Sequence, residues 1–150
     1  MALKEQINND LKAALLGGNR LAGTVLRSIK AVILDEEVAK GVREEGLDDA
    51  AIEQLIAKEV KKRNESASIY DGAGRPELAI DEHAEVKVLS NYLPVQLSED
   101  EIKIVVDRII KETGANSPSA MGQVIGATKK ELGNSADGSL LARIVKDALS

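Results

Sequence analysis

The chain has 150 residues, 43% of them hydrophobic, and it contains no phenylalanine, tryptophan or cysteine. The absence of cysteine excludes disulfides, thiolate nucleophiles and cysteine-based metal sites, and two tyrosines offer little surface for stacking unpaired bases. Because the formal net charge is -5 and charged residues interrupt every apolar stretch, we expect a cytoplasmic protein that does not cross a membrane and whose basic surface is local.

Helical periodicity of the hydrophobic residues extends along the first 94 residues, and no stretch alternates as a strand would. Asn19 and Asp48 are suited to cap helices, and Pro76 is suited to the first turn of another. The expected helices cover about residues 2–16, 20–40, 49–70 and 76–91. Pro94 cannot continue a helix, so we place a boundary there and expect a helical domain over residues 1–94.

Residues 95–150 have the pattern of three further helices. Ser98 and Glu101 have the spacing of a capping box at the start of an amphipathic helix. Ser117-Pro118 is suited to open the next helix, and Asp137 to cap the last. We therefore expect an all-α protein of two small domains, in which the second domain is a three-helix bundle.

The sequence contains no recognisable catalytic constellation. His83 is the single histidine, it lies between Glu82 and Glu85, and no nucleophile or orienting partner can be named for it. The carboxylate run Asp35-Glu36-Glu37 lacks the alternating spacing of a calcium loop. We expect no cofactor and no metal site, and the pattern favours a role without catalysis.

Basic residues gather in three places. Each place is either a solvated helix face, which the acidic total favours, or a contact for phosphate groups. Lys58 and Lys62, four residues apart, repel each other mildly, and a bound anion would relieve this repulsion. The candidate nucleic-acid contacts are Lys58, Lys61, Lys62 and Arg63 in the third helix, Arg27 and Lys30 in the second, and Lys129 and Lys130 in the sixth.

Gly122 and Gly126 are four residues apart and therefore share one face of the sixth expected helix. A glycine inside a helix costs about 1 kcal/mol relative to alanine, so the pair indicates that something approaches this backbone closely. Tight packing of a neighbouring helix is the interpretation we favour. The alternative is the approach of an RNA backbone or of a partner protein.

Two signatures in the last third of the chain resemble the GatB/YqeY domain. The first is YLPVQLSEDE at residues 92–101, and the second is MGQVIGATKK at residues 121–130 followed by ADG at residues 136–138. The resemblance extends toward the N-terminus, because further residues are similar to stand-alone YqeY-like proteins, which place a helical domain ahead of this module. These residues are Lys58 through Arg63, Tyr70, Gly74-Arg75, Leu78, Glu82, Glu85 and Leu89.

The resemblance implies a helical module that also forms the tail of the B subunit of aspartyl/glutamyl-tRNA amidotransferases. That enzyme performs carbon–nitrogen ligation with glutamine as the amide donor, but its catalytic residues lie outside the tail. The function we expect is a non-catalytic accessory protein that binds tRNA or a tRNA-handling enzyme. One alternative is a protein–protein adaptor that docks a partner through the Gly122/Gly126 face. Another is an autonomous amide-forming enzyme, which the family association alone supports.

Overall fold

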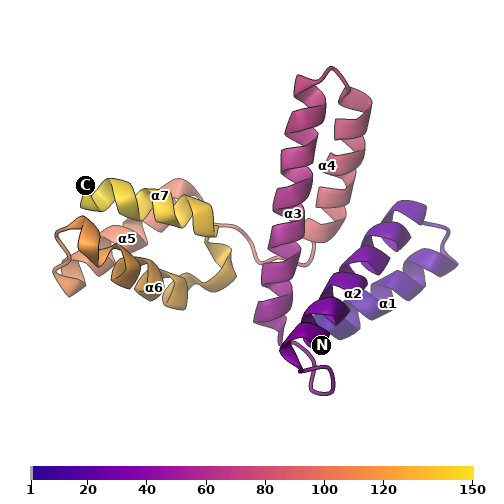
Figure 1. The fold of residues 1–150 in the computed structure, drawn as a ribbon, viewed down its shortest axis with the longest axis horizontal. Coiled ribbons are helices and arrows are strands. Elements are labelled where there is room, and N and C mark those ends of the chain that lie inside the picture. Colours follow the sequence, from indigo (N-terminus) through magenta and orange to yellow (C-terminus); the bar gives the residue numbers. More distant parts are fainter. Residues whose placement is uncertain (1) are drawn as a thin grey trace. The chain divides into compact units, whose positions relative to one another are not determined.

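The computed structural model describes residues 2–150, and over this range the chain is helical and contains no strand. The expected all-α class is therefore confirmed. The chain divides into two compact units, Met1–Leu93 and Pro94–Ser150 (Figure 1).

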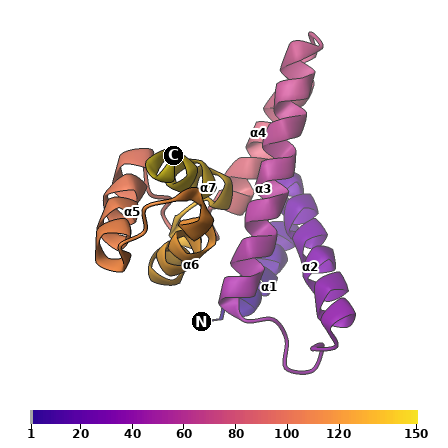
Figure 2. The same ribbon diagram turned by 60° about the vertical axis from the view of Figure 1, so that its left-hand side comes forward.

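Helices of the first unit lie side by side in two pairs, α1 with α2 and α3 with α4 (Figure 1 and Figure 2). Their starts follow from capping: the Asn19 side chain accepts the N–H of Ala22 at 3.1 Å, and Asp48 accepts that of Ala51 at 2.8 Å. The bounds are Leu3–Leu16 for α1, Arg20–Lys40 for α2, Asp49–Gly72 for α3 and Pro76–Ser90 for α4.

The core of the first unit is aliphatic except for Tyr92. Ile29 and Ile33 on α2 are at most 2% exposed and pack among the buried residues of the other helices. Tyr92 is 9% exposed, and its hydroxyl donates a hydrogen bond to the Asp10 carboxylate of α1 at 2.5 Å. Burial raises the pKa of the Tyr92 hydroxyl, and the neighbouring Asp10 carboxylate raises it further. This bond ties the end of α4 to α1.

The second unit contains three α-helices and two short 3-10 turns. Ser98 caps α5 by accepting the Glu101 N–H at 3.2 Å, and Asp137 caps α7 by accepting the Leu140 N–H at 2.9 Å. The helix expected from Ser117-Pro118 opens as a 3-10 turn. The bounds are Glu99–Thr113 for α5, Pro118–Ala120 for η1, Met121–Leu132 for α6, Gly133–Ser135 for η2 and Gly138–Leu149 for α7.

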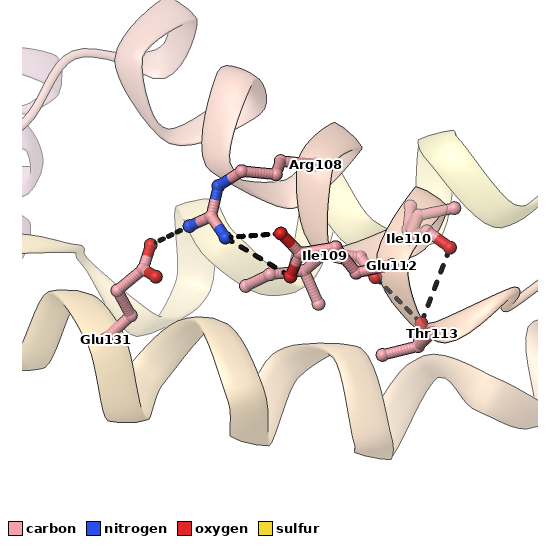
Figure 3. A network of polar contacts seen from close by, with 6 residues as sticks. All are labelled: Arg108, Ile109, Ile110, Glu112, Thr113 and Glu131. Atoms are coloured by element: carbon pink, nitrogen blue, oxygen red, sulfur yellow. Dashed lines mark hydrogen bonds and ion pairs between the residues drawn. The ribbon is translucent and has the colours of Figure 1, made fainter.

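Arg108 on α5 joins two helices of the second unit at the edge of its core. Its guanidinium donates to Glu112 on the same helix at 3.1 Å and to Glu131 on α6 (Figure 3). Figure 3 also shows the last turn of α5, where the Thr113 hydroxyl donates to the carbonyl of Ile109 at 2.8 Å. The ion pair therefore links α5 to the end of α6.

Candidate functional site

The outer face of α6 carries Gly122 and Gly126. Both residues are exposed, and a Cβ added at either position would meet no atom within 4 Å. The tight helix packing that we favoured from the sequence is therefore not observed. The packing of the second unit therefore does not explain why α6 contains two glycines, which weaken a helix.

Contacts on the opposite side of α6 determine which face points outward. Val124 and Thr128 are each 0% exposed and belong to the buried side of the helix. Glu131, which binds Arg108 of α5, follows Gly122 by nine residues, which is about two and a half turns. The carboxylate and the glycines therefore lie on opposite sides of α6. The core contacts and this ion pair hold the glycine face outward.

Lys129 and Lys130, which we predicted as one basic patch, occupy different environments. The Lys129 ammonium donates to the backbone carbonyl of Ala136 at 3.0 Å and so ties α6 to the segment before α7. Lys130 is exposed, as is Gln123. Lys129 therefore has a structural bond of its own, and Lys130 lies beside the glycines.

Glu59 partners two of the basic residues predicted on α3. The Arg63 guanidinium donates to the Glu59 carboxylate at 2.8 Å, and its Nε lies 3.8 Å from Glu85 on α4. Lys62 lies 3.4 Å from Glu59, while Lys61 is exposed. The Arg63 side chain is only 14% exposed, so it serves as a link between α3 and α4.

Lys58 and Lys62 line a groove of about 370 Å³ between α2 and α3. The same groove is lined by Asp35, Glu36 and Glu59, so three carboxylates accompany two ammonium groups. The repulsion between the two ammonium groups of Lys58 and Lys62 therefore needs no external anion to relieve it. This surface is a poor one for phosphate groups, which require an excess of positive charge.

Arg27 and Lys30 are exposed on α2. Lys30 lines a separate pocket together with Lys4 and Arg43, two basic residues that the sequence did not single out. The eight predicted basic residues are thus distributed over both compact units, and within the first unit Lys30 lines a different pocket from Lys58 and Lys62.

Glu37 is the functional candidate that we missed in the sequence. It is 1% exposed, and both of its carboxylate oxygens accept hydrogen bonds from Lys4, at 3.0 and 2.8 Å. The Leu47 N–H donates to the same carboxylate at 3.0 Å. The Lys4 bond and then the Leu47 bond lower the pKa of Glu37 below its ordinary value. Its position four residues after the buried Ile33 was the available signal.

His83 is exposed on α4, and no group of three histidine, aspartate or glutamate side chains within residues 2–150 could hold a metal ion. Over the same residues, none of the helices combines the length and the apolar character needed to cross a bilayer.

The sequence matches the family described as "Yqey-like protein" over residues 4–149. This chain belongs to the YqeY-like protein family. The resemblance that we based on the two C-terminal signatures is thereby confirmed, and it covers nearly the whole chain.

Curated relatives of this YqeY-like chain are named "Altered inheritance of mitochondria protein 41, mitochondrial". The relative from Clavispora lusitaniae is 30% identical over 87% of this chain and 74% of its own length. Those from Kluyveromyces lactis and Lachancea thermotolerans are 29% and 30% identical over 80% and 75% of this chain. The matched regions cover 65% and 60% of these two proteins, so the chain spans less than two thirds of each.

These names contradict two of our predictions. The relatives are named for mitochondrial inheritance and not for tRNA handling, so the prediction of an accessory protein that binds tRNA or a tRNA-handling enzyme is wrong. The charge distribution supplies a physical reason, because three carboxylates share the groove of Lys58 and Lys62, and Lys129 is bound to a carbonyl. The predicted cytoplasmic location is also wrong, since the relatives are named as mitochondrial proteins.

Proposed function

We propose that this YqeY-like chain is a protein-binding module, and that a helix of a partner protein packs across Gly122 and Gly126 on α6. In this proposal residues 1–94 form a four-helix domain and residues 95–150 a three-helix domain that carries the docking face. The open space above both glycines is the observation that supports it.

The physical argument concerns what two exposed glycines do to a helix. Each destabilises α6 by about 1 kcal/mol relative to alanine, and no contact of Gly122 or Gly126 offsets that loss. In return, a backbone without Cβ atoms allows another helix to approach closely. The exposed polar residues Gln123 and Lys130 adjoin this strip and suit the polar rim of an interface.

The names of the relatives suggest the process that this binding serves. We infer that the chain acts in the inheritance of mitochondria and is located there, as its relatives are named. The matched regions cover 60% to 74% of these relatives, and our proposal assigns the shared role to the region that matches this chain.

Complementation tests both parts of the proposal. The chain, fused to a mitochondrial targeting segment, would be expressed in a Kluyveromyces lactis strain that lacks its own relative. The fraction of daughter cells that retain functional mitochondria would then be counted for wild type, Gly126→Leu and Gly126→Ala. Both variants are expected to fold, since a Cβ at this position meets no atom within 4 Å, and circular dichroism of the purified proteins verifies this.

We expect wild type and Gly126→Ala to restore inheritance and Gly126→Leu to fail, because only the larger side chain keeps a partner helix at a distance. Restoration by a folded Gly126→Leu protein would show that the glycine face is not the docking site. Failure of the wild-type chain would show that it does not share the process of its relatives.

A further inference from the structure

The turn between α1 and α2 exposes three leucines at one end of this helix pair (Figure 1). Leu16, the last residue of α1, is 91% exposed, and Leu15 and Leu21 are 54% and 42% exposed. Single exposed leucines are common on protein surfaces, whereas a cluster of them marks a contact with a partner or a membrane. These three lie within one short stretch of chain and therefore form one apolar patch.

Hydrogen bonds of the backbone hold this turn in a compact shape. The Gly17 N–H donates to the carbonyl of Ala13 and the Asn19 N–H to that of Ala14, each at 2.9 Å. Between them, Gly18 has a φ of +73°, which a residue with a side chain rarely adopts. The exposure of the leucines is thus a consequence of the local fold.

The apolar patch lies in a basic part of an acidic chain. Residues 11–34 contain four basic side chains and no acidic one, although the whole chain has a net charge of -5. Asp10, which precedes this range, accepts the hydrogen bond of Tyr92. None of the four cations forms an ion pair within residues 2–150. All four side chains are exposed, and they are Lys12, Arg20, Arg27 and Lys30.

Helix geometry brings these cations close to the leucines. Lys12 precedes Leu16 by four residues, so the two side chains are neighbours on the surface of α1. Arg20 adjoins Leu21 at the start of α2, and Arg27 follows Arg20 by seven residues, which is about two turns of the same face. The turn therefore presents an apolar tip with positive charges beside it.

We propose that the α1–α2 turn binds the surface of a membrane that contains anionic phospholipids. The three leucines enter the boundary between headgroups and acyl chains, and Lys12, Arg20 and Arg27 pair with headgroup phosphates. A soluble polyanion would neutralise the cations but leave the leucines in water, whereas a bilayer offers a phosphate layer above an apolar layer.

Two features of the chain are compatible with this contact. Its acidic residues elsewhere oppose the binding only weakly, because exposed charges farther from the lipid than about 8 Å are largely screened at physiological salt. The turn belongs to the first unit and α6 to the second, and the contact does not rest on the docking proposed above.

Flotation of the full chain with lipid vesicles tests the proposal. Vesicles of phosphatidylcholine alone are compared with vesicles that also contain phosphatidylglycerol. We expect the protein to float with the anionic vesicles only, and less of it to float as the salt concentration rises from about 0.05 to about 0.5 M. Equal flotation with both kinds of vesicle, or with neither, would overturn the proposal. An affinity for soluble polyglutamate or RNA as high as that for the anionic vesicles would also overturn it.

Single substitutions assign the contact to this turn. Leu16→Gln changes a side chain that core packing does not use and should weaken vesicle binding about tenfold. Ile69→Gln on α3, where the side chain is also largely exposed, is the matched control and should leave binding unchanged. Arg20→Gln and Arg27→Gln should each weaken binding about fivefold, whereas Lys111→Gln on α5 should have little effect. Equal effects of the turn variants and their controls would show that the turn is not the site.

A fluorescent reporter tests the entry of the apolar tip into the lipid. The chain contains no tryptophan, so Leu16→Trp introduces a single indole at the turn. Its emission should shift to shorter wavelength with anionic vesicles and be quenched by brominated lipids, while Ile69→Trp should show neither change. Unchanged emission from a Leu16→Trp protein that floats with the vesicles would overturn the proposed insertion.

Discussion

Lys4 of α1 donates to both carboxylate oxygens of Glu37 on α2, at 3.0 and 2.8 Å, although the two residues are 33 positions apart in sequence. The Glu37 side chain is 2% exposed and the Lys4 side chain is 43% exposed. Water can therefore solvate the charge of Lys4, whereas the buried charge of Glu37 depends on its bond to Lys4. The two side chains fasten the first helix to the second at the edge of the aliphatic core.

Replacement of Lys4 by methionine should lower the free energy of unfolding by about 1–3 kcal/mol, because it leaves a buried carboxylate without its principal donor. Urea denaturation at pH 7 measures the change. Lys40→Met is the matched control, since Lys40 and Glu36 are both substantially exposed and their pair should contribute little. Equal effects of the two substitutions would contradict a stabilising role for the Lys4–Glu37 bond.

Glu37 should also make the stability of the protein depend on pH. Its pKa in the folded protein lies below the ordinary value of 4.5, chiefly because of the Lys4 bond. The unfolded chain therefore takes up a proton first, so the stabilisation is complete above pH 4.5 and is lost as the pH falls through the lower folded pKa. Glu37→Gln should lower stability at pH 7 but show a smaller further loss on acidification. Parallel curves for wild type and variant would exclude this assignment.

Alanine at either position of the glycine face should stabilise the second unit. Gly122→Ala and Gly126→Ala are each expected to raise the free energy of unfolding by about 0.5–1 kcal/mol, because the added methyl group meets no atom and alanine favours the helix.

Gly114→Ala provides a matched control at the end of α5. The space around Gly114 is equally open, but its φ of +71° strains any residue with a side chain. This substitution should therefore destabilise the protein. Destabilisation by all three alanines would mean that the α6 face is packed in solution.

Lys129 and Lys130 should respond differently to the same change. Lys129→Met removes the bond to the Ala136 carbonyl and should lower the free energy of unfolding by about 0.5–1.5 kcal/mol. Lys130→Met changes an exposed side chain and should stay within about 0.5 kcal/mol of wild type. Thermal denaturation of the pair compares them directly, and identical melting temperatures would argue against the Lys129–Ala136 bond.

Glu85 should be a mildly unfavourable charge in the first unit. Burial raises the pKa of this carboxyl, the nearby Arg63 opposes the rise, and Glu82 and Asp81 add to it. A raised folded pKa means that the contribution of Glu85 to stability falls as the pH rises from 4.5 through that pKa. Glu85→Gln should therefore raise the melting temperature at pH 7 modestly, while the exposed control Glu65→Gln should not. A lower melting temperature for Glu85→Gln would show that its pairing with Arg63 outweighs the burial.

Local chemistry explains which parts of the fold were predictable from the sequence. The helix starts at Asn19, Asp48, Ser98 and Asp137 depend on one side chain and its own neighbouring N–H groups, and all four caps are present. The start of α6 was missed because the Ser117 hydroxyl lies 2.7 Å from that of Ser119 and caps no N–H group. The chain there forms a 3-10 turn before α6 begins.

The candidate sites depend on contacts between distant residues, and these were less predictable. The spacing of Gly122 and Gly126 showed that they share a face, whereas the side to which that face turns depends on Val124, Thr128 and the Arg108 pair. The run Asp35-Glu36-Glu37 did not single out Glu37 in the sequence, because the partner of this carboxylate comes from another helix. The pocket beside it forms only when α1, α2 and the following segment come together.

Both tyrosines of the chain, Tyr70 and Tyr92, lie in the first compact unit, and the second contains no aromatic side chain. Ultraviolet fluorescence and near-ultraviolet dichroism therefore report on the first unit alone, whereas far-ultraviolet dichroism reports on all the helices. The Tyr92 hydroxyl lies 2.5 Å from the Asp10 carboxylate, and we expect this hydrogen bond to quench the emission of Tyr92 until α1 separates from the end of α4. The two tyrosines thus allow the unfolding of the first compact unit to be followed without any engineered probe.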